Sequence, residues 1–334
     1  MTTLLEARYR AVLRLLPAYY RREREEEMVE TYLWDVDQET QDQSRPTLGE
    51  VASIVALAVR SRLGAGGVPR RYAVLGSAVR LFALFAVLLQ AASAVVDRVL
   101  GLTWASTRGG SQWDMFADGF TGHGVWAGAE AAAQWFLPLL WAVAYFALLR
   151  DRRRLAQASA LVAALPTLLP LVDLWALDFA PSDSAYVVAA AVLACSTALA
   201  LCAAHHRDAP PAALPAGAPG LVFAACCVLM GGSVVALPGG VDTVWALVTC
   251  YLVTALAWVL YRARGENRVP AEEAAALAAL GLLLLAVRIT AVHPWLDVLP
   301  GALRVGVLTQ AAALVALTAA LAVVSGRDLL SRGT

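Results

Sequence analysis

The sequence predicts an all-α protein in which a small cytoplasmic three-helix domain precedes a polytopic membrane helical bundle of about eight spans. Of its 334 residues, 60% are hydrophobic and the mean hydropathy is +0.64, values that exclude an ordinary soluble globular protein. The composition also changes near residue 66. The charged part before it has no apolar run long enough to cross a bilayer, whereas the part after it has a series of them. We therefore assign residues 1–66 and 67–334 to two domains.

Three helices are predicted in the amino-terminal domain. The second covers about residues 19–36 and opens with the charge run RREREEE, whose side chains we expect in solvent. The third begins where Thr47 and Glu50 form a Thr-x-x-Glu capping box. The first ends at Pro17 and carries a stripe of apolar residues at spacings of three and four, typical of a helix packed on one side: Leu5, Tyr9, Val12 and Leu16.

The rest of the chain contains eight apolar stretches of roughly the length that a helix needs to cross the hydrocarbon core. Because proline lacks a backbone N–H and clashes with the preceding turn, Pro166 and Pro170 are expected to bend the third stretch. The predicted spans are residues 72–96, 131–149, 155–174, 186–203, 221–236, 244–260, 274–291 and 305–324.

The distribution of arginine predicts the orientation. With the amino terminus inside, the cytoplasmic segments hold 21 of the 26 arginines and the outer loops hold only Arg98, Arg108 and Arg304. The first residues contain Glu6 and Arg8, so they lack the uninterrupted apolar run of a signal peptide. We expect a multi-pass protein of the cell membrane with both termini in the cytoplasm.

The composition excludes several kinds of activity. The formal net charge is zero, which argues against direct binding of nucleic acid, and the absence of lysine removes P-loop and Schiff-base chemistry. No metalloprotease, nucleophile-elbow or Walker motif is present. We therefore predict no enzyme activity, no catalytic residue, no metal and no cofactor. The five cysteines lie in apolar runs without metal-ligand spacing and are interpreted as core residues: Cys195, Cys202, Cys226, Cys227 and Cys250.

One long outer loop, residues 97–130, is a candidate sensor site. Loops of this length in a compact bundle are typically functional or disordered. The loop either binds a lipid or small amphiphile on its aromatic rings or is a cap that packs those rings on lipid headgroups. Its candidate residues are Trp104, Trp113, Asp114, Asp118 and Trp126.

Two ionisable residues are predicted near the outer ends of spans. Asp173 and Arg288 either pair with each other inside the membrane or reach the interface separately. A charge at that depth is by default paired or functional.

The second helix offers a candidate docking surface. Charged residues set partner choice while a few apolar anchors supply affinity. The alternative is that this face rests against the arginine-rich inner loops and binds nothing else. The candidate docking residues are Glu25, Glu26, Glu27, Met28 and Tyr32.

The stretch VLRLLPAYYRREREEEMVETYL, with Leu16-Pro17, Tyr20-Arg21 and Glu27-Met28 in register, resembles the HAAS signalling domain, also called the permease prefix domain, of bacterial polytopic membrane proteins. The RPTLGE element is similar to the same family, and the likeness covers about 60 residues. It implies a cytoplasmic domain whose gene neighbour is a PadR-like regulator or which is fused to an export permease. The lysine-free, arginine-rich composition is similar to that of actinobacterial proteins. The short loops between the predicted spans depart from the permease branch.

These observations predict a non-enzymatic integral membrane sensor or regulatory anchor, which relays an envelope signal to a cytoplasmic partner through its amino-terminal domain. The alternative is a transporter or permease component that moves a hydrophobic solute. The expected partners are membrane lipids and either a PadR-like regulator, by family resemblance, or a transporter ATPase.

Overall fold

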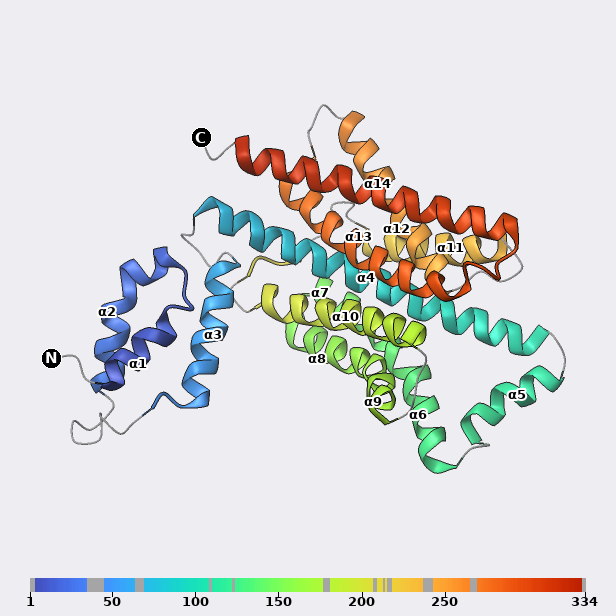
Figure 1. The fold of residues 1–334 in the computed structure, drawn as a ribbon, viewed down its shortest axis with the longest axis horizontal. Coiled ribbons are helices and arrows are strands. Elements are labelled where there is room, and N and C mark those ends of the chain that lie inside the picture. The colour runs from blue at the N-terminus through green and yellow to red at the C-terminus, as the bar shows by residue number, and fades with distance from the viewer. Residues whose placement is uncertain are drawn as a thin grey trace. The chain divides into compact units, whose positions relative to one another are not determined.

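The computed structural model describes residues 4–34, 45–63, 69–107, 110–121, 124–176, 181–206, 209–212, 214, 218–236, 243–264 and 269–331. Within these ranges the regular elements are all helices, which confirms the predicted fold class (Figure 1). The chain divides into two compact units, Met1–Ser77 and Ala78–Thr334. The division falls after Ser77, later than the boundary at residue 66 expected from composition. Each unit is described by itself.

The first unit contains three helices before the start of a long fourth one. Its helices are α1 (Leu4–Leu13), α2 (Ala18–Trp34) and α3 (Leu48–Arg62). The expected capping box begins α3: the Glu50 backbone N–H donates to Thr47 Oγ1 at 3.3 Å, and the Thr47 N–H donates to Glu50 Oε2 at 2.6 Å. The core is small, and its buried members are Tyr9, Leu13, Leu16, Val29, Ile54 and Ala58.

The second unit contains the membrane-spanning helices. Seven helical stretches among the described residues are long and apolar enough to cross a bilayer, so the chain is a multi-pass membrane protein built as a helical bundle. They are Tyr72–Thr107, Val125–Leu149, Ser184–Ala204, Pro219–Ala236, Val244–Arg262, Ala271–Trp295 and Gly301–Arg327. They belong to α4 (Arg70–Thr107), α6 (Val125–Phe136) with η2 (Leu137–Leu139) and α7 (Leu140–Leu149), α10 (Pro181–Ala204), α11 (Pro219–Ala236), α12 (Thr243–Arg264), α13 (Ala271–Val292) with η4 (His293–Trp295), and α14 (Gly301–Ser331).

The third predicted span, like the second, contains a 3-10 turn, but here one residue, Leu168, also lies outside the helical elements. Instead of one helix the structure has α8 (Arg153–Ala164), the short 3-10 turn η3 (Leu165–Thr167) and α9 (Leu169–Ala176). Pro166 lies in η3 and Pro170 at the start of α9, so the missing N–H groups and the ring clashes interrupt the ladder of helical hydrogen bonds. The expected bend is therefore a break, and no single helix here reaches spanning length.

The outer segment predicted as a loop, residues 97–130, is largely helical. The helix α4 continues to Thr107, α5 covers Gly110–Thr121, and α6 begins at Val125 (Figure 1). The reason is visible in the sequence, since α5 repeats apolar residues at helical spacing in Trp113, Phe116 and Phe120. Residues 108–109 and 122–123 lie outside the described part.

Small residues allow the helices of the bundle to approach closely. Of the seven long apolar stretches, that of α4 is the most buried, and in Figure 1 it crosses the middle of the bundle. Alanine supplies much of its contact face and that of α8. The buried alanines of these two helices are Ala78, Ala83, Ala86, Ala91, Ala92, Ala94, Ala105, Ala156, Ala160, Ala163 and Ala164.

Candidate functional site: an apolar cavity in the bundle

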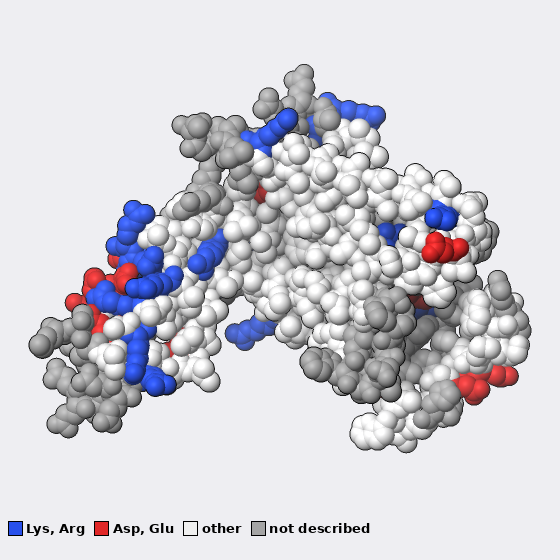
Figure 2. Space-filling view, viewed as in Figure 1, with Lys and Arg blue, Asp and Glu red and all other residues white. Residues whose placement is uncertain are grey.

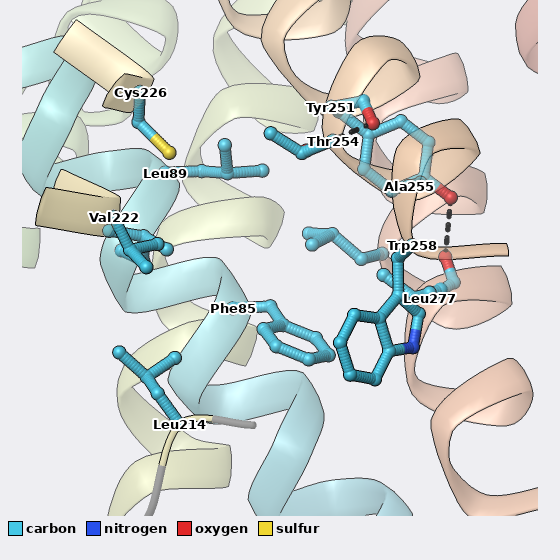
Figure 3. A pocket seen from close by; sticks show the side chains of 12 residues that line it. Phe85, Leu89, Leu214, Val222, Cys226, Tyr251, Thr254, Ala255, Trp258 and Leu277 are labelled. Atoms are coloured by element: carbon cyan, nitrogen blue, oxygen red, sulfur yellow. Dashed lines mark hydrogen bonds between the residues drawn. The ribbon is translucent and has the colours of Figure 1, made fainter. Parts of the chain in front are cut away.

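A cavity of about 180 Å³ lies among α4, α11, α12 and α13. Figure 3 shows Val222, Cys226 and Leu214 on one side of it and Tyr251, Ala255 and Trp258 on the other. The full lining is Phe85, Leu88, Leu89, Leu214, Val222, Cys226, Tyr251, Thr254, Ala255, Trp258, Leu277 and Leu280.

Each wall of the cavity is one face of a helix. The α12 residues Tyr251, Thr254, Ala255 and Trp258 follow the spacing i, i+3, i+4, i+7, which places them in one row. On α4 the lining residues are again three and four apart, and on α11 and α13 they come in pairs with the same spacing. Regular helices thus supply all of the lining except Leu214, which lies in the segment between α10 and α11.

The polar groups of the lining are engaged by the protein itself. The Tyr251 hydroxyl donates to the Leu277 carbonyl oxygen at 2.7 Å, and Thr254 Oγ1 donates to the Cys250 carbonyl oxygen at 2.7 Å (Figure 3 draws the first bond). The Trp258 indole N–H donates to Glu273 Oε2 at 2.9 Å. An occupant of the cavity therefore meets almost only carbon, which suits an apolar molecule and disfavours a polar one.

Trp258 is held by a charged pair at the edge of the cavity. Arg262 Nη2 donates to Glu273 Oε1 at 2.6 Å, and the Arg262 guanidinium carbon lies 4.6 Å from the centre of the Trp258 ring. Glu273 is 7% exposed and lies in the first turn of α13, where the helix dipole favours a negative charge. One carboxylate thus fixes both an indole N–H and a guanidinium, and sequence reasoning had singled out none of the three residues.

Gly281 sets the position of Tyr251 against α13. A Cβ added at Gly281 would lie 2.6 Å from the Tyr251 hydroxyl oxygen and still closer to Thr318 Oγ1. Only glycine admits both groups at this point, so Tyr251 can reach across to the Leu277 carbonyl oxygen.

The cysteines near the cavity are free thiols. Cys226 lines the cavity, and Cys250 Sγ lies 3.9 Å from the Cys226 carbonyl oxygen. Among the residues that the structure describes, no group of three or more His, Cys, Asp or Glu side chains is arranged to hold a metal.

The predicted outer sensor residues are only partly brought together. Trp113 packs on Phe116, with ring centres 5.8 Å apart, and Phe116 and Phe120 pack edge-on against Trp135 at 5.0 and 6.2 Å. Trp126 is 89% exposed, which leaves it outside this aromatic cluster. Figure 1 places α5 and the start of α6 together at one end of α4.

Two further residues of the predicted sensor set, Asp114 and Asp118, lie on α5, and Trp104 is an exposed residue of α4. The aromatic cluster is tied to α4 by Arg98, whose Nε donates to the Trp135 carbonyl oxygen at 2.8 Å and whose guanidinium lies 5.5 Å from the Trp135 ring centre. The rings of the cluster contact one another and are fixed to α4, which fits the alternative of a structural cap.

Asp173, the predicted partner of Arg288, lies outside the residues whose side chains the structure describes. Arg288 itself is buried in α13, with its guanidinium carbon 5.5 Å from the centre of the Trp245 ring. A nearby amide also bridges helices, as Gln310 Nε2 donates to the Trp245 carbonyl oxygen at 3.1 Å.

The proposed docking surface on α2 is partly used within the first unit. Glu26 accepts two hydrogen bonds of 2.8 Å from Arg10, and Glu25 lies 3.8 Å from the same guanidinium. The hydrogen bonds from Arg10 lower the pKa of Glu26 below the ordinary glutamate value. Only Glu27, 3.9 Å from Arg24, points to solvent without a link to another helix of the described unit.

The apolar part of that surface also faces inward. The ring of Tyr32 stacks on that of Tyr9, with centres 3.9 Å apart, and Met28 packs against the small core. Beside them lies an open groove of about 640 Å³ that includes Trp34, whose side chain is 96% exposed. Trp34 is therefore a better candidate than Met28 or Tyr32 for an apolar anchor that contacts a partner protein. The sequence did not indicate its exposure, because Trp34 is the last residue of α2.

The fold and the cavity thus define a polytopic helical membrane protein with an apolar site inside its bundle. Comparison with protein-family models, with curated proteins and with solved structures finds no match to this chain.

Proposed function

We propose that the protein is a non-enzymatic membrane sensor that binds a small apolar molecule, or the end of an acyl chain, in the bundle cavity. The single observation that supports this function is the lining itself, in which the polar groups of Tyr251, Thr254 and Trp258 bond to the protein. An apolar cavity of roughly 150 Å³ stays dry and binds benzene or xenon, and this one measures about 180 Å³.

A sensor also needs a path from its ligand to a partner. The helix that supplies Phe85, Leu88 and Leu89 to the cavity begins at Arg70, within the first unit, and runs unbroken to Thr107. A ligand that prefers one arrangement of the cavity walls would shift the population of that arrangement, and α4 would share in the change. The partner in this proposal is a cytoplasmic regulator of the PadR-like kind, bound by the HAAS-like first unit.

The ligand step is tested with benzene as the probe and full-length protein in nanodiscs. Benzene is expected to raise the melting temperature of the wild type. It should have no such effect on Ala255→Leu, because the added side chain fills the cavity. The control is Leu256→Phe, which adds bulk at an exposed position of the same helix. An equal effect of benzene on all three proteins would refute specific binding in the cavity.

The relay step is tested in two stages. Cytoplasmic proteins are first captured on the full-length chain, and each captured protein is then purified and its binding to the full-length chain is measured. Glu27→Arg should weaken that binding while leaving the melting temperature nearly unchanged, since Glu27 is exposed. Glu26→Arg is unsuitable, because it also breaks the pair with Arg10. If no purified protein binds, the sensor proposal fails.

A transporter for a hydrophobic solute is the second candidate. One observation favours it: the divided helix α8–α9 resembles the discontinuous helices that form substrate sites in transporters. The two functions are distinguished by the rate at which a fluorescent apolar dye leaves dye-loaded liposomes. A transporter should make this rate higher in proteoliposomes than in protein-free liposomes, whereas a sensor should leave the two rates equal.

A further inference from the structure

The turn between α7 and α8 carries four arginines and one aspartate, a net charge of +3 within residues 150–154. Its backbone is fixed by hydrogen bonds that close the end of α7. The Arg152 N–H donates to the Ala147 carbonyl oxygen at 2.8 Å, and the Asp151 N–H donates to that of Leu148 at 3.1 Å. Asp151 takes the left-handed conformation of this motif, with φ of +57°. The arginines therefore project from a defined turn.

Most of this charge is not used within the described part of the fold. Arg153 pairs with Asp151, Nε to Oδ1 at 2.7 Å, and its Nη1 also donates to the His206 carbonyl oxygen. Arg150, Arg152 and Arg154 are exposed, and no hydrogen bond or ion pair of their side chains is found among the residues that the structure describes. Three guanidinium groups are thus available to a ligand.

An open hollow of about 920 Å³ lies beside these arginines, between the start of α8 and the end of α10. It is built on a polar base, where Gln157 Nε2 donates to the His205 carbonyl oxygen at 3.1 Å. Burial lowers the pKa of His205 to about 4, so its ring is neutral at pH 7. The positive charge of the hollow therefore comes from its arginines and not from His205.

An apolar groove continues from the hollow along the outer surface of α7 and α8. The groove measures about 470 Å³ and ends at Arg150 and Arg152. It shares Arg152 and Leu155 with the hollow, so a single elongated molecule can occupy both. Its apolar lining is Ala142, Val143, Phe146, Ala147 and Leu155.

We propose that this hollow and groove form a binding site for an anionic phospholipid, with the phosphate on Arg150, Arg152 and Arg154 and one acyl chain along α7. Guanidinium groups match phosphate oxygens with paired hydrogen bonds, and basic pockets between membrane helices bind anionic headgroups. The groove adds a hydrocarbon surface that inorganic phosphate cannot use. A zwitterionic lipid brings its own cation and gains less from three arginines.

The test measures lipid binding to the full-length protein in mild detergent by native mass spectrometry and by the shift in melting temperature. Phosphatidylglycerol is expected to bind the wild type at least tenfold more tightly than phosphatidylcholine of the same chains. Arg152→Gln with Arg154→Gln should remove that preference, and Arg152→Lys with Arg154→Lys should keep most of it. Arg264→Gln, an exposed arginine at the end of α12, is the control and should behave as the wild type.

Three results would overturn the proposal. The first is equal affinity of the wild type for the two lipids, and the second is an equal loss of the preference in Arg264→Gln, which would indicate a general effect of charge. The third is tight binding of inorganic phosphate that displaces the lipid, which would make the hollow a site for soluble anions. If the glutamine variant does not fold, the proposal is still tested with the lysine variant and with dihexanoyl phosphatidylglycerol. This short-chain lipid should bind the wild type at least tenfold more weakly than long-chain phosphatidylglycerol, because it cannot fill the groove.

Discussion

The two units of this protein are stabilised by different interactions. The amino-terminal unit has a core of a few side chains, supplemented by the stacked rings of Tyr9 and Tyr32 and the ion pairs of Arg10. The bundle has an extensive core of alanine and larger apolar residues, with buried polar bonds such as that from the Tyr251 hydroxyl to the Leu277 carbonyl oxygen. On the face shown in Figure 2, charged atoms are dense over α1 to α3 and sparse over the bundle helices. A polar bond in the bundle should therefore matter more than a similar bond in the first unit.

The largest effect is expected from Glu273→Ala in the bundle. The change leaves Arg262 and the Trp258 N–H without the carboxylate that binds both, and breaking a buried pair costs about 3 to 5 kcal/mol. The neighbouring variant Glu272→Ala, at a half-buried position, is the control and should cost less than about 1 kcal/mol. The measurement is chemical unfolding in detergent, and equal losses for the two variants would show that the buried pair is not special.

A somewhat smaller effect is expected from Leu13→Ala in the first unit. Leu13 is fully buried, so truncation should cost about 3 kcal/mol, a large share of the stability of so small a core. Limited proteolysis should then cleave α1 to α3 and leave the bundle intact, whereas the exposed Leu15→Ala should change little. Simultaneous loss of both units would contradict their independence.

Gly281→Ala tests packing around the cavity. The added methyl group must displace Tyr251 or Thr318, which should cost about 1 to 2 kcal/mol and move the Tyr251 ring. The control is Gly231→Ala on α11, where no atom lies near the new Cβ and the higher helix propensity of alanine should be neutral or stabilising. A neutral Gly281→Ala would mean that α12 and α13 separate easily.

The smallest effect concerns Glu26. Because its pKa is lowered in the folded unit, its contribution to stability is present above the ordinary glutamate pKa and is lost as the pH falls through the lowered value. The free energy of unfolding of the first unit, measured by hydrogen exchange between pH 3 and 6, should therefore depend on pH, and Glu26→Gln should reduce this dependence. Glu27→Gln should leave the dependence as it is in the wild type.

Local patterns in the sequence predicted the local structure well. The stripe of Leu5, Tyr9 and Leu16 is buried as expected, and the capping box of Thr47 is present. The prolines marked the break in the third span. Helical spacing in Trp113, Phe116 and Phe120 was equally readable, but the outer segment was interpreted as a loop because it lies between two spans.

Contacts between distant segments were beyond the sequence. The bond from Arg10 to Glu26 depends on how α1 and α2 cross, and many acidic residues lie within reach of an arginine in such a charge run. The cavity was hidden for a different reason. Every face of a spanning helix is apolar, so hydropathy does not distinguish the face of α12 with Tyr251 and Trp258 from a face that meets lipid.

The length of α4 has a consequence for membranes of different thickness. Its 38 residues measure about 57 Å at 1.5 Å per residue, whereas the hydrocarbon core is about 30 Å thick. Even a tilt of about 40°, the upper end of the usual range, leaves roughly 18 Å of the helix outside the core. The apolar stretch of α4 ends at Asp97 and Arg98, so the part of the helix outside the core lies largely beyond these charged residues, and a thicker bilayer can be matched by a smaller tilt.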